Sequence, residues 1–131
     1  MRVVALLAAI GFMVMALFQV ALAAGAPLGR AAWGGTDAKL RRGQRLASAL
    51  ATALFVLATL VILRRSGLLA SVVPFAFARW ATIVLVGVMA VSAVANVASK
   101  SRWERYLWAP TALTLTAFCL VVALSNVPAV Q

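Results

Sequence analysis

Few side chains in this sequence could perform acid–base or nucleophilic chemistry. The 131 residues contain no histidine, one cysteine (Cys119) and two acidic residues, Asp37 and Glu104. The two acids are far apart in the chain, and Cys119 lies inside an apolar stretch. Enzymes gather several titratable or nucleophilic groups in one protected site, and metal sites use clusters of Cys, His, Asp or Glu. The sequence therefore predicts a protein that is not an enzyme, with no catalytic residue, no cofactor and no bound metal.

Uncharged polar side chains interrupt the apolar stretches, and the two amides, Gln19 and Asn96, are the most polar of them. In one interpretation each polar group makes a hydrogen bond between helices, worth about 0.6 kcal/mol in a membrane. In the other, Gln19 and Asn96 line a small polar cavity for a lipid headgroup or another amphiphile. The smaller polar residues of the same stretches are Thr82, Ser92, Thr114, Thr116 and Ser125.

The stretch 25–35 is the least ordinary part of the chain, with four glycines and a proline around Arg30 and Trp33. Glycine permits backbone conformations closed to other residues and the close approach of a ligand. An indole near a guanidinium suits an anionic, partly apolar target, such as a phospholipid headgroup or a partner's juxtamembrane segment. We therefore predict a recognition loop that closes over one end of the helices, with Gln19 or Asn96 beneath it. In the alternative, the loop is a tight hairpin and Trp33 only anchors it. The predicted loop residues are Gly25, Pro27, Gly29, Arg30, Trp33, Gly34 and Gly35.

The elements that must position these residues are membrane-spanning helices. Hydrophobic residues make up 66% of the chain and charged residues 11%, whereas soluble domains are about half apolar and a quarter charged. A helix needs about 20 apolar residues to cross the hydrocarbon core. Four stretches have that length, so we expect one all-α membrane domain over residues 1–131, an up-down-up-down antiparallel bundle of four transmembrane helices. The predicted spans are 3–24, 46–63, 80–98 and 107–127; the first also resembles a secretory signal peptide, and a retained helix is favoured.

Local signals predict where several helices begin and end. Asp37 suits the N-cap of the second helix, and Gly67 suits a left-handed residue just after its end. Ser101 and Glu104 have the spacing of a capping box, which starts the fourth helix near Arg102. Pro110 then falls inside that helix and removes one backbone hydrogen bond. The segment 64–79 is either interfacial or re-entrant, or else an extension of the third helix.

Basic residues lie almost wholly between the apolar stretches and bring the net charge to +10. This placement fits contact with anionic lipid headgroups and argues against nucleic acid as a partner. The first and third loops carry eight basic residues, while the N-terminus and second loop carry four, which favours loops one and three in the cytoplasm and both termini outside. A first helix that resembles a signal sequence would instead enter with its N-terminus inside. The eight are Arg30, Lys39, Arg41, Arg42, Arg45, Lys100, Arg102 and Arg105, and the four are Arg2, Arg64, Arg65 and Arg79.

Two loop sequences resemble those of a known group of proteins. Residues 25–29 read GAPLG, residues 32–35 read AWGG, and SRWER (101–105) is followed by LWAP (107–110). They resemble the loops of a group of small, uncharacterised four-helix proteins of bacterial inner membranes, frequent in actinobacteria. The resemblance implies the fold and the inner (plasma) membrane, and it supplies no catalytic residue.

Two function classes follow from these observations. The first is a non-enzymatic accessory or scaffold subunit, or a lipid-binding membrane protein, with membrane lipids, a membrane protein or a second copy of the chain as partner. The second is a small transporter or channel for an amphiphilic substrate. A proton-coupled exporter is disfavoured because Gln19, the polar residue of the first span, cannot titrate.

Overall fold

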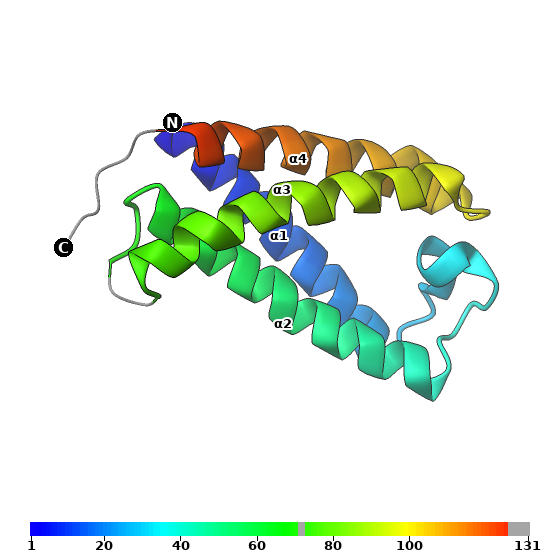
Figure 1. Cartoon of the computed structure of the whole chain (residues 1–131). Coiled ribbons are helices and arrows are strands. Elements are labelled where there is room, and N and C mark those ends of the chain that lie inside the picture. Colours follow the sequence, from blue (N-terminus) through cyan, green and yellow to red (C-terminus); the bar gives the residue numbers. More distant parts are fainter. Residues whose placement is uncertain (71–72, 126–131) are drawn as a thin grey trace.

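The computed structural model of this chain describes residues 1–70 and 73–125. Within that part of the chain, four long helices are joined by one long and two shorter connections: α1 (Arg2–Ala23), α2 (Arg42–Arg65), α3 (Phe75–Ala98) and α4 (Ala109–Leu124). Two short 3₁₀ turns, η1 (Gly29–Ala31) and η2 (Trp33–Gly35), lie in the first loop, and a π-helical turn, η3 (Glu104–Trp108), runs directly into α4. The helices alternate in direction, so the first loop and the α3–α4 connection share one end of the bundle (Figure 1).

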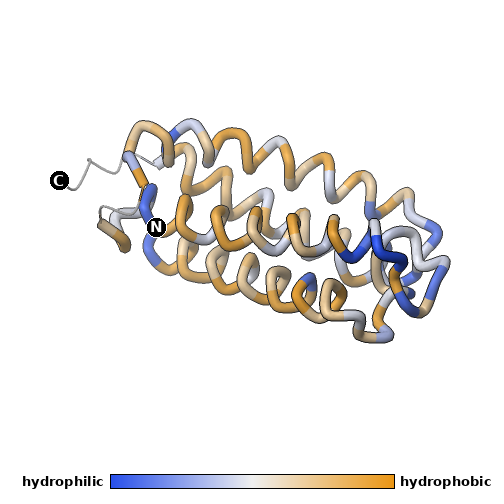
Figure 2. The backbone as a smooth tube through the Cα atoms, turned by 90° about the horizontal axis from the view of Figure 1, so that it is seen from below, coloured by the Kyte–Doolittle hydropathy of each residue, from blue (hydrophilic) through white to orange (hydrophobic). Residues whose placement is uncertain are grey.

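All four helices, with η3 and α4 taken together, are long and apolar enough to cross a membrane. Hydrophilic residues gather towards the two ends of the bundle, and mostly hydrophobic residues fill the length between them (Figure 2). Large apolar side chains such as Ile10, Val84 and Val91 face outward. Water penalises such exposure, whereas lipid tails are as apolar as these side chains. The predicted four-helix bundle is confirmed, and its surface is that of a multi-pass membrane protein.

Two helix pairs build the bundle: α1 packs mainly on α2, and α3 packs mainly on α4. Contacts of α2 with α3 and of α1 with α4 join the pairs. The core between them is apolar and includes Phe12, Ile62, Met89 and Leu115, all nearly inaccessible. Phe12 stacks on Phe55 of α2, with ring centroids 6.2 Å apart.

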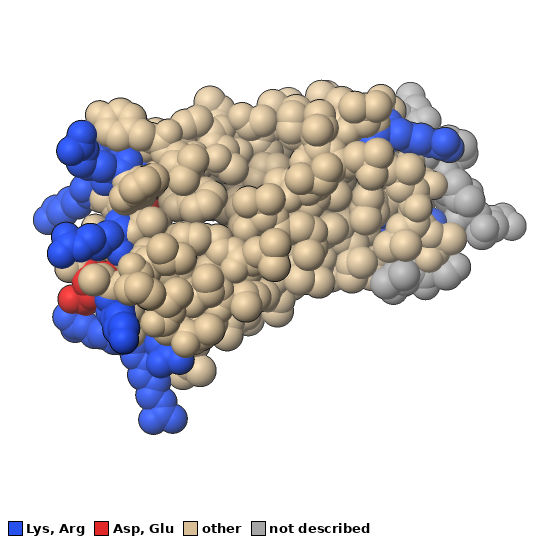
Figure 3. Space-filling model, turned by 180° about the vertical axis from the view of Figure 1, so that it is seen from behind, with Lys and Arg blue, Asp and Glu red and all other residues tan. Residues whose placement is uncertain are grey.

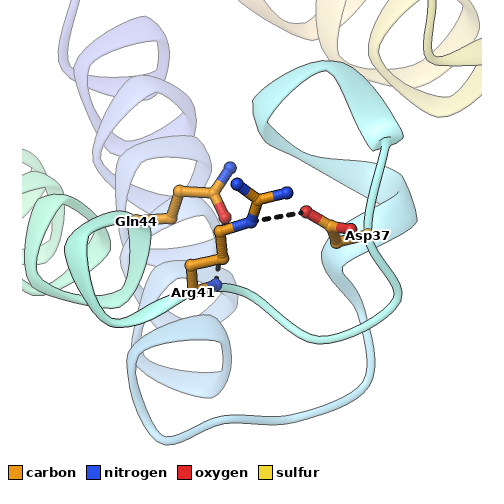
Figure 4. Close-up of polar contacts among 3 residues, drawn as sticks. All are labelled: Asp37, Arg41 and Gln44. Carbon is orange, nitrogen blue, oxygen red and sulfur yellow. Dashed lines mark hydrogen bonds and ion pairs between the residues drawn. The ribbon is translucent and has the colours of Figure 1, made fainter.

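The start of α2 differs from the expectation. Asp37 is not its N-cap: the N-cap is Arg41, and the helix begins at Arg42. The carbonyl of Ala38 accepts a hydrogen bond from the Gly29 N–H at 2.9 Å. This bond holds residues 37–38 against the beginning of the first loop, so they do not join the helix. Asp37 pairs with Arg41 at 3.3 Å, and Gln44 Oε1 accepts from the Arg41 N–H at 3.0 Å (Figure 4). Gln44, at position N3, thus makes the capping-box bond in which the N3 side chain accepts from the backbone N–H of the N-cap.

The end of α2 agrees with the expectation for Gly67. This residue has a φ of +72°. Its N–H donates to the Arg64 carbonyl and the Leu68 N–H donates to the Leu63 carbonyl, at 3.2 and 3.0 Å. These two bonds form a Schellman motif, in which a left-handed glycine satisfies the last carbonyls of a helix.

The segment 64–79 contains the last residues of α2, the connection that follows and the first residues of α3. Arg64 and Arg65 still belong to α2, and α3 begins at Phe75 with Pro74 as its N-cap. Of the two open interpretations, an extension of the third helix therefore holds for 75–79. Residues 71–72, and the predicted end of the fourth span at 127, lie outside the described residues.

Pro110 is accommodated by the π-helical turn that precedes it. Helical residues begin at Arg102, as expected, and the Ala109 N–H donates to the carbonyl of Glu104, five residues earlier. A π turn inserts one residue into the helix and shifts its hydrogen-bond register. Pro110, which has no N–H to donate, then falls in the first turn of α4, where the missing donor is best tolerated.

Arg64 and Arg65 are buried, which the sequence pattern did not indicate. Their side chains are 8% and 6% exposed, and both guanidinium groups lie 5.5 Å from the ring centroid of Phe75. Arg65 Nη2 donates to the carbonyl of Ser125 at 2.5 Å, which joins the end of α2 to the end of α4. These arginines thus act in tertiary packing as well as at a helix terminus.

Candidate functional site

A cavity of about 360 Å³ lies beneath the first loop, between the loop and the helices at that end of the bundle. Its wall comes from α1, α2, α3, η3 and the first loop. Aromatic and apolar side chains make up one part of the wall, and amide, hydroxyl and carboxylate groups make up the rest. The lining residues are Met15, Phe18, Gln19, Ala31, Ala32, Trp33, Phe55, Ser92, Ala95, Asn96, Glu104 and Trp108.

The first loop is held over the cavity by hydrogen bonds to the α3–α4 connection. The Gly34 N–H lies 3.2 Å from both carboxylate oxygens of Glu104. Ser101 Oγ donates to the Arg30 carbonyl at 2.7 Å, and Trp108 Nε1 donates to the Ala31 carbonyl at 2.9 Å. Three bonds from one connection thereby fix the loop backbone from residue 30 to residue 34.

Two glycines of the loop have no room for a side chain. A Cβ on Gly29 would lie 2.3 Å from the Asp37 carbonyl oxygen. A Cβ on Gly35 would lie 2.7 Å from the Arg30 carbonyl oxygen and 2.9 Å from Ser101 Cβ, and Gly35 also has a φ of +70°. The loop therefore needs glycine at these positions for its own close packing.

Trp33 and Trp108 form the aromatic part of the wall. The Trp33 indole N–H donates to Ser48 Oγ on α2 at 3.0 Å, and Ser48 is fully buried. Trp33 reaches this position with a φ of +51°, a left-handed conformation that is uncommon outside glycine. The ring of Trp108 packs on Phe18 with centroids 4.7 Å apart. Both indole N–H groups are thus bonded within the protein, although the Trp33 side chain is still 43% exposed; Trp80 and Trp103 are more exposed, at 66% and 59%.

The capping box predicted at Ser101 and Glu104 forms only in part. The Glu104 N–H donates to Ser101 Oγ at 3.4 Å. The return bond is missing, because the Ser101 N–H donates to Ser99 Oγ at 3.0 Å instead. The Ser99 hydroxyl in turn donates to the Glu104 carboxylate. Glu104 is turned away from its own helix start towards Gly34, so its main role is tertiary.

Gln19 and Asn96 both line the cavity, together with Ser92. Gln19 Oε1 is buried and has no hydrogen-bond partner among the described residues. The threonines of the spans do not bridge helices either. Thr82, Thr114 and Thr116 each donate to a carbonyl four residues earlier in the same helix. The interpretation of these groups as bonds between helices is therefore wrong for the threonines, whereas the two amides lie in the cavity wall.

The other predicted loop residues do not line the cavity. Arg30 contributes its carbonyl to the loop contact, but its side chain is exposed and lines no part of the wall. Gly25 has a φ of +93°, and a Cβ there would lie 3.3 Å from the Arg45 guanidinium, which donates to the Ala23 carbonyl. Pro27 lies in the turn between α1 and η1.

Comparison of the chain with protein-family models, curated proteins and solved structures finds no match. The chemistry of the site must therefore be deduced from its own residues. Glu104 is its one acidic group, and its other polar groups are amides, hydroxyls and indole N–H groups. The volume lies within the range of about 300–1,000 Å³ typical of small-molecule sites. Such a wall can bind a compact polar group attached to an apolar chain.

For four residues of the site the sequence predicted no role there: Phe18, Ser48, Glu104 and Trp108. Glu104 was predicted only as part of a helix cap, and Trp108 stood only within the loop sequence LWAP. Trp108 and Ala31 are 77 residues apart, and Gly34 and Glu104 are 70 apart. The one available signal was that both conspicuous loop sequences, at 25–35 and at 101–110, belong to loops on the same side of a four-helix bundle.

Proposed function

We propose that this protein is a non-enzymatic, multi-pass protein of a bacterial inner (plasma) membrane that binds a lipid-like amphiphile beneath its first loop. As a binding protein it acts as an accessory or scaffold subunit. One observation carries the proposal: Gln19 Oε1 is buried at the cavity wall without a donor among the described residues. A buried acceptor without a partner costs about 1–3 kcal/mol, and a ligand that donates a hydrogen bond removes that cost. The loop resemblance to inner-membrane proteins supports the compartment.

The position of the cavity favours binding over conduction. Farther from the loop, the interior of the bundle is filled by apolar side chains, among them Phe12, Ile62, Met89 and Leu115. A pore needs polar groups on matching faces along its length. The polar groups of this site instead cluster at the loop end, where an amphiphile could place its head in the cavity and its chain along the lipid-facing surface.

Filling the cavity should weaken lipid binding. Ala95 lines the cavity wall, and an indole there would occupy the space without removing a hydrogen bond. We expect the wild-type protein, extracted in a maltoside detergent, to retain a bound lipid in native mass spectrometry. In Ala95→Trp the retained fraction should fall about tenfold, which corresponds to a loss of 1.4 kcal/mol in binding.

The matched control is Val94→Trp on the same helix. Val94 is 70% exposed and lines no part of the cavity, so its variant adds the same bulk to the outer surface. It should retain lipid as the wild type does. Equal lipid retention in the two tryptophan variants would contradict binding in this cavity.

The charge distribution supports an orientation with the first loop in the cytoplasm. Lys and Arg crowd one end of the space-filling view, while the opposite end shows fewer (Figure 3). The crowded end carries the eight basic residues of the first and third loops. Basic residues are retained on the cytoplasmic side of short loops.

This orientation can be tested by cysteine labelling. Ala70 and Thr36 are both exposed and can report the two ends of the bundle. In a Cys119→Ser background, an impermeant thiol reagent added to intact cells should label Ala70→Cys and leave Thr36→Cys unlabelled. Both should label after the cells are opened. The reverse pattern in intact cells would invert the orientation.

A further inference from the structure

The charges of the cavity differ from those of the surface around it. The chain has twelve basic residues and two acidic ones, and eight of the basic residues lie at this end, in the two connections or in the adjoining helical turns. Yet the titratable side chain in the cavity wall is a carboxylate, Glu104, and no Lys or Arg lines the wall. In this net positive protein, the one charged side chain of the cavity wall is therefore negative.

The charge of Glu104 is not balanced by a basic partner within the described residues. The carboxylate accepts hydrogen bonds from the Gly34 N–H and the Ser99 hydroxyl, which are both neutral. The guanidinium of Arg105 donates to the Ser99 carbonyl instead. By contrast, the other acid, Asp37, forms an ion pair with Arg41. A partly buried carboxylate held by neutral donors keeps its negative charge available to a cation.

The rest of the wall also favours a cation. Trp33, Trp108 and Phe18 present aromatic side chains to the cavity. The face of an aromatic ring attracts an ammonium group, and aromatic cages are a recurring way to bind quaternary ammonium. Gln19 Oε1 is a buried acceptor without a partner, which suits a donor such as a primary ammonium.

We infer that this cavity binds an ammonium group, primary or quaternary, carried by an amphiphile. The inference rests on the proposed function and names the chemistry of its ligand. The basic side chains at this end are exposed, and solvent and salt weaken their repulsion of a cation in the cavity. They also suit a zwitterionic headgroup, whose phosphate faces the basic loops while its ammonium enters the cavity. The ammonium can come from a phospholipid headgroup or from a free organic cation.

A pair of probes that differ only in charge tests the inference. Dodecyltrimethylammonium and its neutral isostere, with a tert-butyl group in place of the trimethylammonium, are titrated into the full chain in maltoside micelles. Binding is followed by the fluorescence of Trp33 and Trp108 in a Trp80→Phe, Trp103→Phe background. The cation should bind about tenfold more tightly than the isostere. Equal binding of the two overturns the ammonium assignment and leaves the proposed function standing, whereas binding of neither probe and of no dodecylammonium, whose N–H groups can donate to Gln19 Oε1, overturns both.

Glu104→Gln and Asp37→Asn form the matched pair of variants. Glutamine keeps an acceptor for the Gly34 N–H while removing the charge, so the preference for the cation should fall about tenfold. Asp37 lines no part of the cavity, and its variant should keep the full preference. An unchanged preference in Glu104→Gln would overturn the role of this carboxylate. If that variant unfolds, the comparison of the two probes on the wild type decides alone.

Competition identifies the source of the ammonium. Phosphatidylethanolamine added to the micelles should displace dodecyltrimethylammonium if the ligand is a lipid, with phosphatidylglycerol as the control. Tetramethylammonium chloride should displace it if a free organic cation suffices, with sodium chloride as the control. Displacement by phosphatidylglycerol and not by either ammonium compound would contradict the inference.

Discussion

Replacing Gly35 with alanine should destabilise the protein by about 3 kcal/mol, the sum of a left-handed backbone and an overpacked contact. Gly35 has a φ of +70°, and its Cβ would lie 2.7 Å from the Arg30 carbonyl oxygen and 2.9 Å from Ser101 Cβ. The first of these neighbours is backbone and cannot move alone. The variant should therefore separate the first loop from the α3–α4 connection. Thermal unfolding in detergent, followed by circular dichroism, measures the loss.

Two other glycines separate the effect of the left-handed backbone on stability from the effect of the close packing. Gly34 has a φ of +83° but nothing within 4 Å of an added Cβ, so Gly34→Ala should lose only about 1–2 kcal/mol from the backbone term. Gly43 lies in α2 with open space around it, so Gly43→Ala should gain about 0.5–1 kcal/mol. If Gly35→Ala is no less stable than Gly34→Ala, the close packing described here does not exist.

Replacing Glu104 with alanine should destabilise the protein by about 2–3 kcal/mol, within the range for hydrogen bonds to a charged group. The Gly34 N–H and the Ser99 hydroxyl both lose their acceptor. The first loop should then open more often, and the Gly34 amide should exchange its hydrogen faster. Thermal unfolding and hydrogen exchange measured by mass spectrometry report these two effects separately.

The comparison with Asp37→Ala shows whether Glu104→Ala loses stability through the contacts of Glu104 or through the loss of a negative charge. Asp37 and Arg41 form an exposed ion pair, with side chains 36% and 80% accessible, and such pairs contribute less than about 1 kcal/mol. Asp37→Ala should therefore change stability little and leave the exchange at Gly34 as it is. Equal effects of the two alanine variants would mean that Glu104 does not hold the loop.

The sequence by itself determined the four helices and their approximate ends. A membrane-spanning helix must satisfy its backbone within the span and present apolar side chains to lipid, so the length of an apolar stretch is a nearly sufficient signal. The end of α2 at Gly67 could also be predicted, since the hydrogen bonds of this C-cap involve residues 63–68 alone. The importance of the first loop was also visible, because four glycines and a proline in eleven residues require an unusual backbone path.

Patterns that depend on distant partners misled the sequence-based interpretation. Asp37 has the chemistry of an N-cap, but the bond between Gly29 and Ala38 holds that segment out of the helix. Glu104 stands at the spacing of a capping box, but Gly34 and Ser99 engage its carboxylate. Local propensities are worth about 1 kcal/mol each, and one or two tertiary hydrogen bonds outweigh them.

Only the tertiary structure decided what the loops enclose. The wall of the cavity combines Gln19 from α1, Asn96 from α3, Trp33 from the first loop and Glu104 from η3, and no spacing along the chain relates these positions. The same holds for the burial of Arg64 and Arg65 against Phe75, which depends on the path from α2 into α3. Hydropathy predicts which residues lie in lipid, because the free energy of transfer from water to lipid is set by each residue separately. A cavity depends on which side chains meet once the helices pack, and that is a property of the assembled bundle.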